Sequence, residues 1–63
     1  MRVTLQELSD STWYNQKILV EVDNQKIPMA NAFDIGKPEF KKLKNRWVRS
    51  IGADGGTLVV RLI

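Results

Sequence analysis

The chain has 63 residues, of which 43% are hydrophobic types and 27% are charged, with a formal net charge of +3 at pH 7, and it contains neither Cys nor His. Disulfides, thiolate nucleophiles, imidazole bases and metal sites built from Cys or His are therefore excluded. This length predicts one small domain, 1–63, which buries only about 60% of the surface that its unfolded chain exposes. Packing, a bound partner or association into a homo-oligomer must stabilise it, and these alternatives stay open.

The sequence shows no pattern for export or membrane insertion. Thr4, Gln6 and Glu7 place polar side chains where a signal peptide would be apolar. The longest purely apolar runs, Ile18 to Val20 and Leu58 to Val60, are far shorter than the roughly 20 residues that span a bilayer. We expect a cytoplasmic protein that does not bind membranes.

The first predicted element is a short helix from Leu5 to Asp10. Thr4 and Glu7 have the spacing of a capping box, in which each side chain bonds the backbone N–H of the other residue. Val3 and Leu8 occupy the flanking positions of a hydrophobic staple, which fixes the direction in which the chain enters the helix.

Apolar residues then alternate with period two, which predicts a strand over 17–22. Residues 23–25 supply turn chemistry, because Asp and Asn tolerate left-handed backbone angles. Ile27 and Met29 resume the alternation and predict a returning strand. Pro28 has no backbone N–H, so this strand should be short and lie at a sheet edge or a bulge.

Residues 30–37 have no clear period and are predicted to form a connection. Pro38 stands at a favourable first helical position and predicts a second short helix over 38–44. Phe40 and Leu43 would share one side of that helix and face the core.

A second hairpin is predicted from a strand over 46–51, a turn over 52–56 and a strand over 57–63. In the last strand Leu58, Val60 and Leu62 share one face. The other face is half apolar, which is typical of a central strand covered on both sides or of a strand at a subunit contact. Together the elements predict an α+β fold with a small antiparallel sheet of about four strands in two hairpins and one or two short helices. The alternative is a small SH3-like or OB-like β-barrel without these helices.

The sequence offers little equipment for catalysis. Glu21 and Asp23 are the only close acid pair on one predicted strand face, a pattern typical of a solvated strand edge. The glycine-rich stretch 52–56 precedes a strand, whereas phosphate-binding loops precede a helix, so it indicates a turn. We expect no enzyme and no catalytic, cofactor or metal site. The enzymatic alternative would need Glu21, Asp23 and Asp34 to hold Mg²⁺ together.

The positive charge is concentrated in residues 37–49, which carry a net +5, whereas residues 1–36 carry −2. A basic segment with interleaved aromatic residues is typical of nucleic-acid binding. In that interpretation the ring of Trp47 stacks on a base. The phosphates are bound by the basic side chains of Lys41, Lys42, Lys44, Arg46 and Arg49. The segment also fits an ordinary solvated face with Trp47 and Ile51 buried, in which Trp47 or Arg49, which share a strand face, lies at a rim, or a surface that binds an acidic protein.

Trp13 and Tyr14 are adjacent at the predicted start of the first hairpin. Neighbouring strand positions face opposite sides, so one of the two side chains should lie in the core and the other should be exposed or at an interface. Both are candidate anchors for a partner, because aromatic residues are enriched at binding hot spots.

Several short segments resemble small accessory proteins of phages and mobile elements of Gram-positive bacteria. These segments cover about half of the chain: Val3–Leu8, Ile18–Asn24, Trp47–Ile51 and Gly56–Val60. The basic segment departs from that family, in which the corresponding connection is more acidic. The resemblance implies a non-enzymatic accessory role and carries over no catalytic residues.

The leading hypothesis is a small binding protein that occupies a surface on a protein partner and thereby modulates or inhibits it. An acidic surface or a nucleic-acid-handling complex would suit the basic segment. The alternative is direct nucleic-acid binding through residues 37–49, whose affinity should fall steeply with salt.

Overall fold

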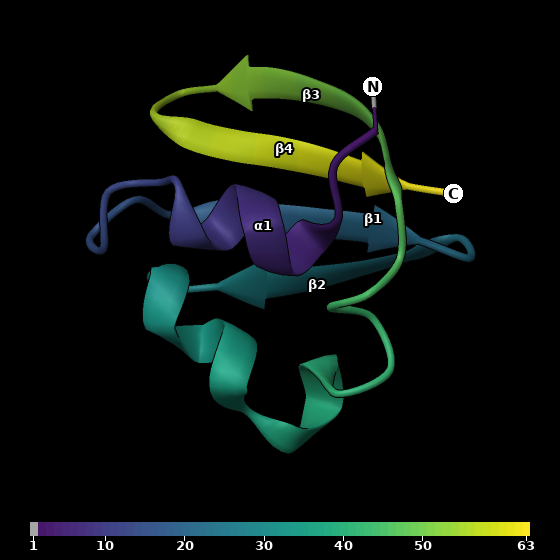
Figure 1. Cartoon of the computed structure of the whole chain (residues 1–63). Helices are drawn as coiled ribbons and strands as arrows, with labels where there is room; N and C mark the ends of the chain where they lie inside the picture. The colour runs from purple at the N-terminus through teal and green to yellow at the C-terminus, as the bar shows by residue number, and fades with distance from the viewer. Residues whose placement is uncertain (1) are drawn as a thin grey trace.

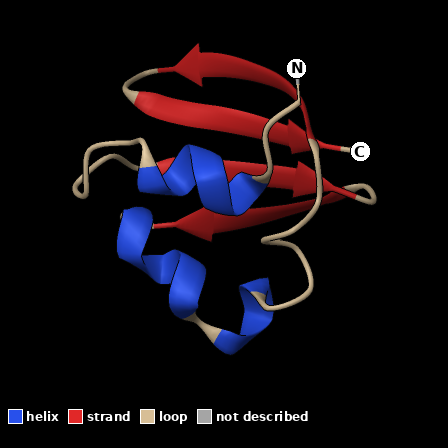
Figure 2. Ribbon diagram, viewed as in Figure 1, coloured by secondary structure: helices blue, strands red, loops and turns tan. Residues whose placement is uncertain are grey.

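A single four-stranded sheet forms the centre of the protein, with a short α-helix across one of its faces and the 3-10 helices beside one of its edge strands (Figures 1 and 2). The computed structural model describes residues 2–63, which form a body of 23 × 22 × 21 Å. No helix among them is long and apolar enough to cross a membrane. The elements in chain order are α1 (Leu5–Asp10), β1 (Ile18–Val22), β2 (Gln25–Met29), the 3-10 helices η1 (Ala32–Gly36) and η2 (Pro38–Phe40), β3 (Val48–Asp54) and β4 (Thr57–Leu62).

Helix α1 begins at the predicted capping box. The Thr4 hydroxyl accepts the Glu7 N–H at 3.2 Å, and the Glu7 carboxylate accepts the Thr4 N–H at 3.1 Å. Two otherwise unpaired donors of the first turn are satisfied in this way. The predicted helix from Leu5 to Asp10 is confirmed in type and bounds.

The first hairpin pairs β1 with β2 in antiparallel register, with Val20 opposite Ile27. Asp23 and Asn24 form its two-residue turn with φ of 51° and 64°, in the left-handed region that such a turn requires. Strand β2 lies at the sheet edge, as Pro28 predicts.

The second hairpin is longer on its first strand than the sequence predicts. Strand β3 begins at Val48 and runs to Asp54, so the expected five-residue turn over 52–56 is wrong. Only Gly55 and Gly56 form the turn, with φ of 56° and 86°. Because two adjacent residues with positive φ suffice for a tight hairpin, Gly52 to Asp54 are free to pair with β4.

The two predicted hairpins and the α+β class are confirmed, and the sheet has free edges rather than the closed barrel of the alternative. Its strand order is β2-β1-β4-β3, and the hairpins meet through a parallel pair, β1 with β4. The sheet is therefore mixed. A parallel pair requires a crossover connection. Between β1 and β4 this connection consists of β2, residues 30–47 and β3.

The predicted helix over 38–44 is only partly formed. Pro38 starts a 3-10 turn that ends at Phe40, and residues 41–45 continue as turns. The Phe40 carbonyl accepts from both the Leu43 and Lys44 N–H groups, at 3.0 and 2.9 Å, so the chain tightens instead of extending an α-helix. A further 3-10 helix, η1, occupies the stretch that was expected to be an irregular connection.

The core lies between the sheet and the helical layer. Phe40 is fully buried, as predicted, and Leu43 packs beside the core half-buried. Strand β4 is central and buries Val60 on this side, while its other face, which includes Val59 and Arg61, carries no helix of residues 2–63 (Figure 2). The central cluster consists of Leu5, Ile18, Val20, Val22, Met29, Phe40, Val48, Val60 and Leu62.

Candidate binding surfaces

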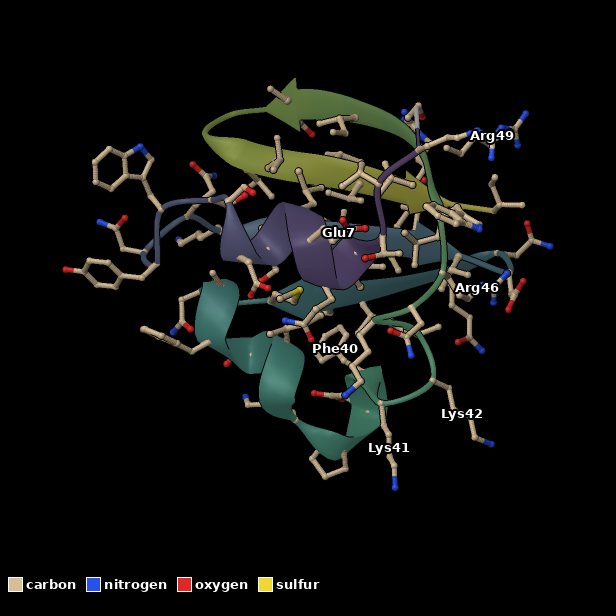
Figure 3. All side chains as sticks on the ribbon, in the orientation of Figure 1. Glu7, Phe40, Lys41, Lys42, Arg46 and Arg49 are labelled. Carbon is tan, nitrogen blue, oxygen red and sulfur yellow. The ribbon has the colours of Figure 1, made fainter. Side chains whose placement is uncertain are left out.

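The basic segment, residues 37–49, follows one margin of the molecule from η2 to the start of β3. In Figure 3 Lys41 and Lys42 extend from the lower part of this margin, and Arg46 and Arg49 project higher along it. The segment lies on the surface because Phe40 and Val48 occupy the core and the residues between them are mostly exposed or half-exposed.

Two basic side chains of this segment are held by contacts within the fold. Lys37 Nζ lies 3.3 Å from Asp34 Oδ1, and Arg46 Nη1 lies 3.0 Å from Asp23 Oδ2. Arg46 also donates from Nε to the Ile63 carbonyl at 2.8 Å and from Nη2 to the same oxygen. Arg46 therefore joins the first hairpin to the end of β4. Within the basic segment, the side chains that form no ion pair with any of residues 2–63 are Lys41, Lys42, Lys44 and Arg49.

These four side chains do not gather at one hollow. Lys41 and Lys44 line a shallow depression of about 380 Å³ beside η2. Arg49 lines a different depression, of about 390 Å³, whose wall includes Glu21 and Asp23. A bound polyanion would meet these carboxylates at the second site, so the basic segment divides into a cationic part near η2 and a part of mixed charge near β3.

Trp47 is 48% exposed, so the interpretation that buries it is wrong. Residues 47, 49 and 51 would share one face in a regular strand, but the register of β3 shifts between Val48 and Ser50. This bulge lets Val48 fill the core and leaves Ile51 half-buried against it. The Trp47 carbonyl accepts the Ile63 N–H at 3.0 Å, so its backbone is fixed while its ring meets solvent.

Trp13 and Tyr14 in the loop before β1 and Phe33 in η1 are exposed aromatic residues, here together called the aromatic tip. Their side chains are 81%, 62% and 75% exposed, so the expectation that Trp13 or Tyr14 enters the core is wrong. The two residues precede β1 in a loop, where the alternation of strand faces does not apply. The Tyr14 and Phe33 ring centroids lie 6.1 Å apart with an interplanar angle of 35°.

Backbone contacts hold the two halves of the aromatic tip together. The Tyr14 carbonyl accepts the Ala32 N–H at 3.0 Å, and the Ala32 carbonyl accepts the buried Ser9 hydroxyl at 2.9 Å. Thus α1, the loop and η1 are joined at one end of the molecule (Figure 1). Tyr14 and Phe33 also border a hollow of about 360 Å³.

Phe33 is a member of this surface that the sequence reasoning missed. Its segment lacks a period, which conceals which side chains face out. The available signal was Asn31, a preferred residue for a helix N-cap. Its side-chain oxygen accepts the Phe33 N–H at 2.9 Å and begins η1 there, with Ala32 turned inward and Phe33 outward.

Asp34 fixes η1 to the end of β2. Its Oδ2 accepts the Ala30 N–H at 2.8 Å, and its Oδ1 pairs with Lys37. The hydrogen bond from Ala30, aided by Lys37, holds the pKa of Asp34 below its ordinary value, against a smaller opposing effect of burial. The charged carboxylate therefore stabilises the folded state.

We expect Asp34→Asn to be less stable than the unchanged protein at pH 7, with a difference that closes as the pH falls below about 4. A lowered pKa in the folded state adds stability above the unfolded pKa, and this is lost as the pH falls through the folded one. Urea unfolding at pH 7 and at pH 3 measures the difference. Lys37→Met, which keeps the Ala30 bond, should remove only part of it, and a difference that is the same at both pH values contradicts this role of the carboxylate.

The acids considered for a metal site lie at separate ion pairs. Asp23 pairs with Arg46, Asp34 with Lys37, and Glu21 with Arg61 at 3.5 Å. No group of three or more Asp or Glu side chains within residues 2–63 is placed to share a metal ion. Comparisons of the chain with protein-family models, with curated proteins and with solved structures found no match.

Proposed function

We propose that the chain is a small non-enzymatic binding protein that docks on a protein partner through the aromatic tip. The observation that carries this proposal is the exposure of three large aromatic residues, at 62% to 81%, on two segments joined by the backbone hydrogen bond between Ala32 and Tyr14. Isolated exposed apolar residues are ordinary, but here the Tyr14 and Phe33 rings are adjacent and Trp13 precedes Tyr14 in the same loop, and such a concentration of exposed aromatic residues on a small domain is typical of an interaction site.

The fixed backbone favours binding energetically. Ordering side chains and loops on association costs free energy, which a preorganised surface reduces. Tyr14 and Phe33 are already adjacent, and Ser9 holds the turn beneath them from inside the core. A partner with an apolar depression would bury these rings with little rearrangement.

The resemblance to accessory proteins of phages and mobile elements supports the biological setting of the proposal. Such a chain acts in the cytoplasm and modulates or inhibits its partner by occupying a surface, which needs no catalytic group. The alternative, nucleic-acid binding, is supported by the unpaired Lys41, Lys42 and Lys44 and by the exposed Trp47. The mixed charge beside Arg49, where Glu21 and Asp23 line the same hollow, makes it the second candidate.

The test is capture of a protein from a lysate of a Gram-positive bacterium with immobilised chain, followed by binding measurements on the purified partner. We expect Trp13→Ala combined with Phe33→Ala to weaken binding by at least about 30-fold, because a hot-spot side chain contributes about 2 kcal/mol or more. Both residues are exposed, so the fold should be retained, which circular dichroism checks.

The matched control replaces Lys41, Lys42 and Lys44 with alanine, which changes another surface, where the first two are exposed and Lys44 is half-exposed, without touching the aromatic tip. This variant should keep the partner's affinity within about threefold, as rim charges usually contribute little. Equal binding by the tip variant would overturn the proposal. Binding that nuclease treatment abolishes, and that is lost in the lysine variant and at higher salt, would establish the nucleic-acid function in its place.

A further inference from the structure

Strand β3 presents a free edge. It is an outer strand of the sheet, paired with β4 on one side only. On its other side Val3 accepts the Val48 N–H at 2.7 Å, and Thr4 bridges to Trp47. Beyond Val48, no strand within residues 2–63 pairs with this edge, which stays open along Ser50–Asp54.

The tight turn determines which backbone groups point outward. In a two-residue hairpin the flanking residues, here Asp54 and Thr57, exchange both backbone hydrogen bonds. Bonding then alternates along the strand, so Gly52 also bonds toward β4. The N–H and C=O groups of Ile51 and Ala53 consequently face the open edge, where they are available to another strand.

The open edge lacks most of the features that prevent pairing with another chain. It contains no Pro and no Lys, and its only irregularity is the bulge beside Arg49. Gly52 has no side chain, and an added Cβ there would meet nothing within 4 Å, so no side chain covers the strand at this point. The opposite edge of the sheet, β2, is interrupted by Pro28.

We propose that the open edge of β3 pairs antiparallel with the same edge of a second copy of this chain, about a twofold axis at Gly52. This register places Ile51 opposite Ala53 of the second copy and, by symmetry, Ala53 opposite its Ile51. Their outward N–H and C=O groups then form four hydrogen bonds. Gly52 meets its own counterpart as a non-hydrogen-bonded pair, the type with the shorter Cα separation, which the missing side chain permits.

The distribution of charge along β3 supports pairing with a second copy of the chain about a twofold axis at Gly52. Arg49 and Asp54 stand at the two ends of the open edge, and neither has an ion-pair partner among residues 2–63. Asp54 shares the face of Ser50 and Arg61 by strand alternation, and Arg49 lines the same hollow as Arg61. The twofold axis places each Asp54 opposite Ser50 of the other copy and beside its Arg49, so two ion pairs form across the axis.

The experiment measures mass by light scattering during size-exclusion chromatography, over micromolar to millimolar chain concentrations. The unchanged chain should double its 7.2 kDa mass as concentration rises. Arg49→Glu and Asp54→Arg should each weaken association at least about tenfold, because each places two like-charged pairs across the axis. An equimolar mixture of the two variants should restore the dimer, since both of its interfacial pairs are then of opposite charge.

Restoration by mixing separates the proposal from loss of folding, because a misfolded variant gains nothing from another variant. Ala53→Pro gives a second readout: it removes an outward N–H donor at an exposed position and should weaken the dimer while the monomer stays folded. A chain that stays at 7.2 kDa throughout the concentration range would overturn the proposal. So would a dimer that all three single variants preserve, which would place the contact on another surface. The aromatic tip takes no part in this interface, so its variants should dimerise normally.

Discussion

Replacing Phe40 with alanine should lower the free energy of unfolding by about 3–5 kcal/mol. The Phe40 side chain is fully buried and is the largest member of the core cluster, so the variant leaves a cavity that neighbouring strands can fill only in part. A chain of 63 residues has a total stability of roughly 3–9 kcal/mol. The loss is therefore a large part of the total stability, and the urea midpoint of unfolding should fall sharply, as titration followed by far-ultraviolet circular dichroism will measure.

Phe33→Ala is the matched control, because it makes the same chemical change in the same crossover connection. Its ring is 75% exposed, so we expect a loss below about 1 kcal/mol. Equal losses at the two positions would show that the ring at position 33 is also buried, which contradicts the exposed aromatic tip. Phe40→Leu should recover much of the stability, since it refills most of the volume.

Elements with strong local signals were predictable from the sequence. The capping box at Thr4 and Glu7 satisfies its own donors within one turn of chain, so it needs no tertiary information. The same holds for the first turn, where Asp23 and Asn24 accept left-handed angles. Pro28 correctly indicated an edge strand, because the absence of its N–H is a property of the residue itself.

Features that depend on distant partners were not predictable in this way. The parallel pairing of β1 with β4 is set by how the hairpins meet, and neither hairpin's alternation contains that information. The bulge before Ser50 reverses the face of Trp47 relative to Ile51, and only the pairing with β4 reveals it. The glycine-rich stretch could have been a turn along its whole length, but hydrogen bonding to β4 extends β3 through Gly52 to Asp54.

For the candidate surfaces, too, residue types were predictable from the sequence, whereas contacts between distant residues were not. Charge counting located the basic segment, but ion pairing is a property of the fold: Arg46 is held by Asp23 and the Ile63 carbonyl, and Lys37 by Asp34. Trp13 was identified as a candidate anchor from its residue type. Phe33 joins it only because the Tyr14 carbonyl binds the Ala32 N–H from another part of the chain.

Leu5→Ala should destabilise the protein by about 2–5 kcal/mol. Leu5 is fully buried where α1 contacts the core cluster. Alanine has the highest intrinsic helix propensity, so the substitution favours the isolated helix and any loss of stability must come from packing. Urea unfolding measures the loss of stability. The substitution leaves Thr4 and Glu7 in place, so the capping box at the start of α1 is the same in both proteins.

Leu19→Ala makes the same change on the opposite face of β1, where no helix of residues 2–63 covers the sheet and the side chain is only half-buried. We expect it to cost less than about 1.5 kcal/mol. The ratio of the stability losses of Leu5→Ala and Leu19→Ala measures how far the core is confined to one face of the sheet. This measurement needs no binding partner. The dimer proposed at the edge of β3 extends the sheet in its own plane and leaves both faces as they are, so the ratio should not change with chain concentration. Equal losses would mean that the second face of the sheet is covered as completely as the first. The description of a core on one face of the sheet only would then be wrong.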